Sequence, residues 1–331
     1  MDHIQQNTLF PQMPPLQHIT FTRFRFILRT DAATRLPEFS GSALRGGFGM
    51  ALKKTACTQP RCPDCHQCLV RRQCVYSLIF ETPVPEGSEL MSKYPAAPHP
   101  FVLEPPEDGE VPAGQELEFG LVLIGQTIDL LPWFILAFEE LGRSGLGTRV
   151  NGKRGRFRLV SVSQLLGEEN VLLYQGDTRT LTAPVAPCPE PGALPRQVGE
   201  GLRITLHTPM RIKYQGHFTE RLDFHILFRN LLRRISLLSF FHCGQRLDDS
   251  GFAELIRQAE QVVTVAHHLR WQEQSRWSGR QQTRMQFGGL LGTACYRGGF
   301  TPFLPCLELG AQIHCGKGCT FGLGRFSIDW V

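Results

Sequence analysis

The chain has 331 residues, 42% of them hydrophobic and 20% charged, which describes a globular protein with room for two ordinary domains. The apolar runs at 117–124 and 130–138 are shorter than a membrane span, and the N-terminus lacks the basic start and apolar core of a secretion signal, so we expect a cytoplasmic protein without a membrane partner. The net charge of +5 permits an acidic partner without proving one. Eleven cysteines in such a chain indicate metal ligands or free thiols rather than a disulfide framework.

The N-terminal part combines an arm, a strand and a glycine-containing helix. Residues 1–18 are polar and proline-rich and predict a flexible arm, and residues 19–29 alternate as a strand does. Ser40 or Ser42 can cap a helix that runs to about residue 54. Glycines inside a helix weaken it, so those at 46, 47 and 49 indicate close approach of backbone or of a ligand. The basic residues of this helix are candidate RNA contacts: Arg45, Lys53 and Lys54.

A dense group of cysteines follows this helix. The five are Cys57, Cys62, Cys65, Cys68 and Cys74. Two C-x-x-C steps share the middle cysteine, and thiolates at this density hold zinc or an iron–sulfur cluster well. We expect four of the five to bind a structural metal, with zinc favoured over an iron–sulfur cluster, and free thiols as the alternative. No histidine and glutamate set for activating water accompanies them, so the expected role is to fix an insertion.

The rest of the first half completes a βαββαβ pattern. Strands are predicted at 75–81, 116–124 and 157–165, with a proline-rich crossing at 83–106 and a helix at 129–141. This order predicts a ferredoxin-like domain over 19–181 with a cysteine-rich insertion at 57–74. The loop at 142–156 is rich in glycine and arginine, and is either a phosphate-binding loop or a solvated mobile one. Its candidate RNA contacts are Arg149, Lys153 and Arg154.

Residues 182–200 have the proline content of a linker, and a second βαββαβ pattern occupies 201–331. The fold class predicted is therefore α+β, with two tandem ferredoxin-like (RRM-like) domains. A long helix at 222–242 carries Arg233, a further candidate RNA contact, on its polar stripe. The segment around Trp271 and Trp277 mixes indoles with Arg276 and Arg280, which can stack a base and hold a phosphate, or can anchor a long hairpin.

The glycine-rich loop at 316–325 lies between the last helix and the last strand. Its glycines are Gly316, Gly318, Gly322 and Gly324, and its charged residues include Lys317 and Arg325. Glycine lets backbone N–H groups approach an anion closely, so the loop suits phosphate binding. A turn that only closes the sheet is the alternative.

Several segments together resemble the RAMP superfamily of CRISPR-associated proteins. The last helix, glycine-rich loop and final strand are similar to the signature that closes this superfamily, and the segments 271–280, 285–299 and 44–52 resemble its repeat-processing endoribonuclease branch. The resemblance spans roughly residues 20–331. It implies a metal-independent endoribonuclease that processes precursor crRNA by attack of the 2′-hydroxyl, with CRISPR repeat RNA and crRNA as partners, retention on the guide RNA, and contact with other effector subunits.

One departure from this family leaves the catalytic group open. Family members commonly use a histidine around the first helix, but this helix has Met50, and no histidine occurs between His18 and His66. Cleavage would then rest on a histidine elsewhere, for which His314 beside the glycine-rich loop is the candidate, with Lys317 at the phosphate. The alternative is a non-catalytic RNA-binding structural subunit of a CRISPR effector complex.

Overall fold

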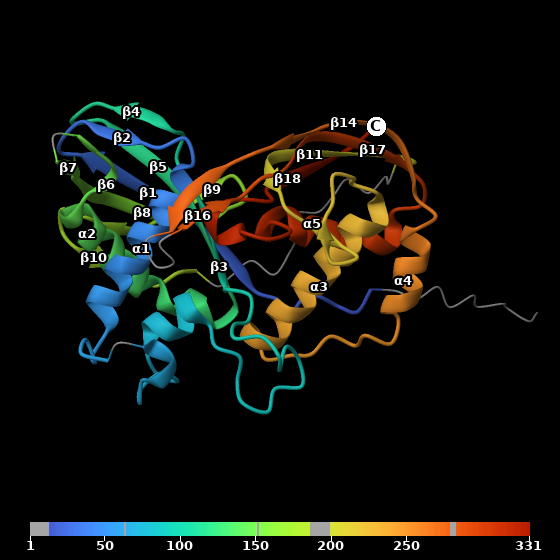
Figure 1. The fold of residues 1–331 in the computed structure, drawn as a ribbon, viewed down its shortest axis with the longest axis horizontal. Coiled ribbons are helices and arrows are strands. Elements are labelled where there is room, and N and C mark those ends of the chain that lie inside the picture. The colour runs from blue at the N-terminus through green and yellow to red at the C-terminus, as the bar shows by residue number, and fades with distance from the viewer. Residues whose placement is uncertain (1–12, 63, 151, 186–198, 279–282) are drawn as a thin grey trace, which may run out of the picture.

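The computed structural model describes the chain except residues 1–12, 63, 151, 186–198 and 279–282. It consists of two α/β halves that lie side by side, each built from a sheet covered by helices (Figure 1). In the described ranges, no helix is both long and apolar enough to cross a membrane.

The first half is a ferredoxin-like unit with an enlarged sheet. Its main elements are β1 (Phe21–Thr30), α1 (Ser40–Ala56), β3 (Phe101–Glu104), β5 (Glu116–Ile124), α2 (Leu131–Ser144) and β8 (Phe157–Leu166). The sheet order β8-β1-β5-β3 places the first and third strands in the centre, as a βαββαβ unit requires. Two further strands, β9 (Glu169–Gln175) and β10 (Thr180–Leu181), extend this sheet beyond β8.

The prediction of a strand at 75–81 is wrong. Residues Ser77–Glu81 form a single wide helical turn, and the second strand of the unit is β3, inside the segment predicted as a proline-rich crossing. The aromatic and β-branched residues of 75–81 suggested a strand, but one side of the turn buries Ile79 completely. The local composition therefore predicted correctly that this segment is buried, but its backbone is helical rather than extended.

The second half repeats the same topology. Its main elements are β11 (Gly201–Met210), α3 (Phe224–His242), α4 (Phe252–Ala259), β14 (Val263–Gln272), β17 (Gly289–Arg297), α5 (Leu304–Ile313) and β18 (Phe326–Trp330). They form an antiparallel sheet of order β14-β17-β11-β18, which is again the ferredoxin-like order. The tandem fold predicted from the sequence is thus present, whereas the metal-binding role of the cysteine segment is a separate question.

Short two-stranded sheets decorate both halves. They pair β2 (Thr34–Leu36) with β4 (Gly109–Val111), β6 (Leu146–Val150) with β7 (Lys153–Gly155), β12 (Lys213–Tyr214) with β13 (His217–Phe218), and β15 (Ser275–Ser278) with β16 (Thr283–Gln286). The segment predicted as a loop at 142–156 thus contains the end of α2 and the β6–β7 hairpin. Short 3₁₀ turns lie at Cys65–Gln67, Gly125–Leu130, Thr301–Phe303 and Cys319–Phe321.

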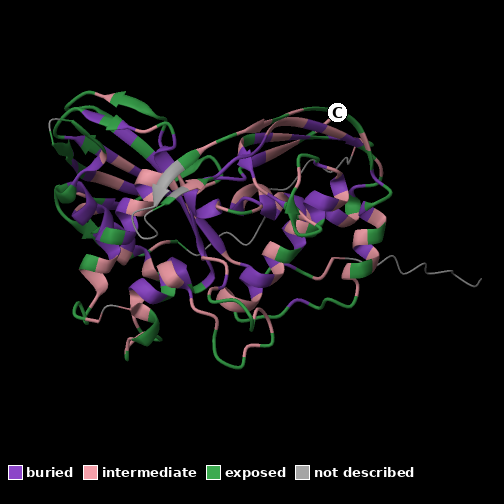
Figure 2. Cartoon of the chain, in the orientation of Figure 1, coloured by how far each residue is buried: buried purple, intermediate pink, exposed green. Residues whose placement is uncertain are grey.

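The central strands of the first sheet are buried on both faces, and one of these faces packs against the second half. Along β5, Phe119, Leu121 and Leu123 pack against α1 and α2, whereas Val122 and Ile124 belong to the core of the second half. A strand buried on both faces has no need of alternating polar residues. Figure 2 shows the resulting band of buried residues where the halves meet.

Part of the predicted arm also packs on the second half. Leu16 is buried in the same core, and the His18 ring lies 2.7 Å from the hydroxyl of Ser239 on α3. Of the predicted linker at 182–200, residues 186–198 lie outside the described residues.

Helix α1 begins at Ser40, but not through a side-chain cap. The Ser40 hydroxyl donates to the carbonyl of Pro106, 2.7 Å away. The glycines of α1 have different roles: a Cβ on Gly49 would come within 2.3 Å of the Phe80 ring, whereas a Cβ on Gly46 would meet nothing within 4 Å. Gly49 is therefore needed for packing, and Gly46 leaves open space.

This difference gives a test by thermal or chemical denaturation. A Gly46→Ala variant should be more stable by up to about 1 kcal/mol, since alanine favours the helix and the added methyl is unopposed. Gly49→Ala should lose about 1–3 kcal/mol because the Phe80 ring must move. Equal effects in the two variants would contradict the packing described for α1.

Candidate active site

A cavity of about 970 Å³ lies against α1, and its lining includes Arg45, Lys53, Tyr76 and Glu81. It is lined by one stripe of α1, by the helical turn Ser77–Glu81 and the residue before it, by Arg154 of β7, and by Ser275 and Met285 of the β15–β16 hairpin. Because this hairpin belongs to the second half, the cavity lies between the halves. Positions 42, 46, 50 and 53 share the stripe because helical neighbours recur every three to four residues.

Lys53, Tyr76 and Glu81 form a connected group in this cavity. The Lys53 ammonium lies 5.6 Å from the centroid of the Tyr76 ring, and the Tyr76 hydroxyl donates to the Glu81 carboxylate at 2.9 Å. Met50 stands one helical turn before Lys53, with 62% of its surface exposed. A cation, a phenol, a carboxylate and an exposed thioether thus line the same cavity.

Arg45 connects the cavity to the glycine-rich loop. Its guanidinium carbon lies 4.3 Å from the centroid of the Phe80 ring and 4.6 Å from that of Phe321. Its Nε donates to the hydroxyl of Thr320 at 2.8 Å. A guanidinium stacked between two rings is held firmly, so Arg45 joins the halves at the wall of the cavity.

His99 also lines this cavity but is poorly suited to proton transfer. Its Nδ1 lies 2.7 Å from the Thr82 hydroxyl, and an Arg45 nitrogen lies 3.4 Å from its Nε2. Burial and the Arg45 charge lower the pKa of His99 to about 3. The ring is therefore neutral, and too weak a base for efficient catalysis near neutral pH.

The structure places His314 inside the molecule, away from any surface that RNA could reach. Its side chain is 0% exposed, with Nε2 3.1 Å from Glu104 and Nδ1 3.1 Å from the Leu323 carbonyl. Burial lowers the pKa of His314, against the effect of the Glu104 carboxylate. His314 therefore fits a structural role at the junction of the halves better than the catalytic role that its sequence position suggested.

Glu104 is the centre of this junction. It accepts two bonds from Arg23, at 2.9 and 2.7 Å, and Arg325 of the glycine-rich loop lies 3.8 Å away. Burial alone raises the pKa of Glu104, but the bond from His314 and the charges of Arg23 and Arg325 outweigh it and lower the pKa to about 2. The Glu104 carboxylate of the first half thus interacts with Arg23 of the same half and with His314 and Arg325 of the second half.

The glycine-rich loop is mostly turned toward protein. Each of its four glycines has a positive φ. A Cβ on Gly324 would overlap the Cys315 carbonyl, and one on Gly322 would meet Pro105 at 2.4 Å. Loop N–H groups at 315, 317, 321, 322, 324 and 325 donate to oxygens of the protein. These contacts favour the interpretation of this loop as a packed turn, and Gly316 and Gly318 give no separate sign of an anion site.

The other predicted RNA contacts are distributed over several surfaces. Lys317 is exposed, and its pKa is lowered by partial desolvation and by the charges of Arg233 and Lys213, which indicates a basic cluster on the second half. Arg149 and Lys153 are exposed on β6 and β7. Lys54 points away from the cavity, in an ion pair with Glu140. Arg276 lies on β15. Arg280 lies outside the described residues.

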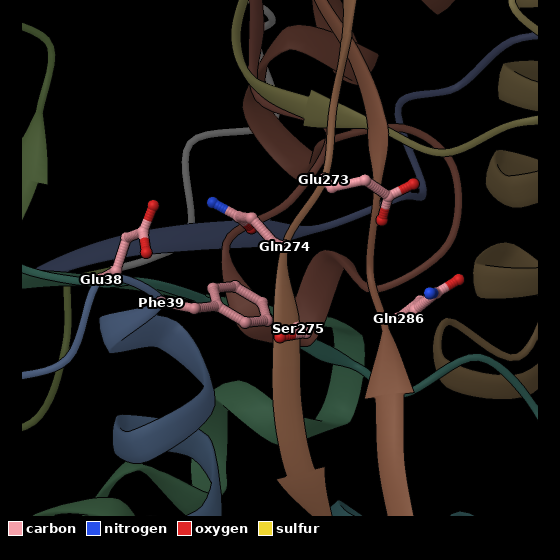
Figure 3. A pocket seen from close by; sticks show the side chains of 6 residues that line it. All are labelled: Glu38, Phe39, Glu273, Gln274, Ser275 and Gln286. Carbon is pink, nitrogen blue, oxygen red and sulfur yellow. The ribbon is translucent and has the colours of Figure 1, made fainter.

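A second pocket adjoins the first. Figure 3 shows its six residues: Glu38, Phe39, Glu273, Gln274, Ser275 and Gln286. Three of them, Glu38, Phe39 and Ser275, also line the larger cavity. The pocket therefore continues the interdomain cleft from the start of α1 along the β15–β16 hairpin. Two carboxylates and two amides give it polar groups that suit the edges of bases better than phosphates.

Sequence reasoning missed Tyr76 and Glu81 as cavity residues. The signal that could have found Tyr76 is its position, two residues after the last cysteine of the cluster. Glu81 and His99 reach the cavity only through the fold, since 31 and 49 residues separate them from position 50 (81 − 50 and 99 − 50).

Comparison with known proteins defines the class. Residues 17–186, just over half of the chain, match the family model AF_1859_N, described as an N-terminal domain, and residues 204–326 match the model of the CRISPR-associated endoribonuclease Cas6. An uncharacterized protein of Archaeoglobus fulgidus is 25% identical over 296 residues, covering 88% of this chain and 92% of that protein.

Solved structures share the fold at low identity. The product complex of Cas6 (TTHB231) matches with a TM-score of 0.55 at 15% identity, covering 94% of this chain and 99% of that one. Thermus thermophilus Cas6 (TTHB231) itself gives 0.51 at 14% identity, with the same coverage. A partial Cas6-RT-Cas1–Cas2 complex gives 0.52 at 14% identity, covering 97% of this chain and 47% of that one.

The fold is thus that of the tandem ferredoxin-like proteins with a cleft between the halves, and the family is a CRISPR-associated, precursor-crRNA-processing one. By the longer of the two matches the chain belongs to the AF_1859_N family, and its residues 204–326 are similar to the CRISPR-associated endoribonuclease Cas6 family.

Proposed function

We propose that this protein binds CRISPR repeat RNA and cuts it by metal-independent transesterification in the cavity along α1, and that it retains the processed guide RNA. The observation that carries the proposal is the placement of Lys53, Tyr76, Glu81 and Arg154 around one interdomain cavity in a chain similar to the Cas6 family. This similarity supports the reaction class, and the cavity supports the location.

The reaction needs proton transfer, orientation of the 2′-hydroxyl and charge stabilisation, all of which these residues can supply. The 2′-oxygen of the nucleotide before the cut attacks phosphorus, its proton leaves to a base, and the 5′-oxygen departs with a proton, giving a 2′,3′-cyclic phosphate and a 5′-hydroxyl. Glu81, through its bond with Tyr76, can accept the first proton and orient the 2′-hydroxyl. The Lys53 ammonium can stabilise the charge on the phosphate and supply the second proton.

A non-catalytic RNA-binding subunit of a CRISPR effector complex is the second candidate. Two observations favour it: Met50 occupies the most exposed position of the α1 stripe, and His99, which lines the cavity, has a pKa of about 3. Both candidates require RNA in the cleft and differ in whether the backbone is cut.

The decisive experiment incubates the purified chain with the repeat RNA encoded beside its gene, in excess EDTA, with and without a 2′-deoxy substitution at the cut site. Cleavage that persists in EDTA and disappears with the deoxy substrate is the expected result. A shifted but uncut band would make the protein a binding subunit. A shift with the purified product RNA as well is the result expected for retention.

Matched lysines test the location of the reaction. Lys53→Ala should lower single-turnover cleavage by roughly 10²-fold or more, because it removes the cation beside Tyr76. The control is Lys54→Ala, one residue further on, which faces Glu140 outside the cavity and should cut within about threefold of the unmodified protein. Comparable losses in both variants would move the reaction away from this cavity.

A further inference from the structure

The cysteine segment between α1 and the turn Ser77–Glu81 has almost no core of its own. Among described residues from 57 to 75, none is buried, and Leu69 is 99% exposed. Before residue 75, its described residues form one element of regular structure, the 3₁₀ turn Cys65–Gln67. A stretch of this length loses about 1–2 kcal/mol of conformational entropy per ordered residue, which apolar burial here does not offset.

The fold nevertheless gathers all five cysteines of this segment. Cys57, Cys62, Cys65, Cys68 and Cys74 line one small cavity at the end of α1. Each is only partly buried, in contrast with Cys306, Cys315 and Cys319, which are buried in the core of the second half. A cysteine that serves packing is usually buried, so the five have another use.

We propose that four of these five cysteines bind one zinc ion, which holds this segment in place. In the ranges described, no three side chains of the metal-binding types stand ready around a common point, so binding would draw the thiols inward. A tetrahedral set of four sulfurs at about 2.3 Å from zinc requires a compact group of thiolates, which one shared cavity can supply. The fifth cysteine stays outside the set.

The zinc site would also position the proposed reaction groups, an extension that rests on the function proposed above. The charge of Lys53 acts on the Cys65 thiol, and Tyr76 lines both the cysteine cavity and the cavity along α1. Four thiolates around zinc carry a net negative charge, which would hold the Lys53 ammonium at the edge of the site. The ion takes no part in the reaction and fixes the two segments that contribute to it.

Metal content tests the proposal without RNA. The full chain, purified after growth with zinc, should contain about one zinc ion per chain by inductively coupled plasma mass spectrometry. Its visible spectrum should show no absorption from an iron–sulfur cluster. Cobalt exchanged into the site should give the intense thiolate-to-metal bands of a four-sulfur site. Less than about a tenth of an ion per chain after reconstitution, or an iron chromophore, would overturn the zinc assignment.

Single serine variants identify the ligands. Four of the five cysteine variants should lose zinc and the cobalt bands, and the fifth should keep both. The matched controls are Cys243→Ser and Cys295→Ser, partly buried cysteines of the second half, which should keep full zinc content. Zinc retained by all five variants, and by the Cys65→Ser/Cys68→Ser double variant, would place the ion elsewhere and contradict the proposal.

Cleavage is a separate readout of positioning. Relative to the zinc-loaded chain, zinc-free chain that keeps its circular dichroism spectrum should cut RNA roughly 10–100 times more slowly. Equal rates with and without zinc would contradict the positioning role and leave the zinc site standing. If the unmodified chain binds RNA without cutting it, the metal measurements still decide the zinc site.

Discussion

A Met50→His variant should cut repeat RNA roughly 10²–10⁴ times faster than the unmodified chain under single-turnover conditions, the contribution typical of one acid–base group. Position 50 is exposed on the α1 stripe that lines the cavity, one turn before Lys53. An imidazole there would add a group with a pKa near about 6.5, suited to moving the proton of the 2′-hydroxyl or of the leaving oxygen. If the unmodified chain does not cut, the same change should create activity.

The pH profile distinguishes catalysis from better binding. The added imidazole should make the cleavage rate of Met50→His change with pH near about pH 6–7. The variant Met50→Gln, which is polar but has no titrating group, should not show this change. The control is Leu172→His, which adds an exposed histidine on β9, outside the residues that line the cavity, and should leave the rate unchanged. Unchanged cleavage in Met50→His, with RNA affinity intact, would show that α1 does not face the scissile phosphate.

A Glu104→Gln variant should lose about 3–5 kcal/mol of folding stability, the range expected when one partner of a buried ion pair is removed. The amide would leave Arg23 and Arg325 without their carboxylate and would disturb the buried His314 ring. The matched control is Glu116→Gln, which breaks an exposed pair with Arg29 and should cost at most about 1 kcal/mol. Urea denaturation of the two variants makes the comparison.

The low pKa of Glu104 also predicts how stability depends on pH. Its folded pKa of about 2 lies below its ordinary value of 4.5, so the carboxylate stabilises the folded chain fully above about pH 4.5. That contribution is lost as the pH falls from about 4.5 toward 2, because the unfolded chain binds the proton first. Glu104→Gln should flatten this part of the stability curve. An identical acid dependence in the variant would exclude Glu104 as its source.

The contact between Glu104 and His314 also explains why the structure does not support the predicted catalytic role of His314. His314 stands beside a glycine-rich loop, and loops of this kind are often exposed and bind anions. Here Leu103 and Pro105 of the first half approach the loop, and Glu104 meets the histidine from the same side. Such a contact joins positions 210 residues apart. Nothing in the local sequence encodes it.

The sequence by itself determined the second βαββαβ unit, the first one apart from its second strand, and the glycine-containing helix with Met50. Each of these follows from local periodicity, glycine content or a motif read in order, since the chemistry concerned lies within a few residues. The tertiary structure alone decided that His314 is buried, that Tyr76 lies in a helical turn at the cavity, and that the five cysteines share one cavity. Burial and the meeting of distant segments depend on how the halves pack, and packing is a property of the whole chain.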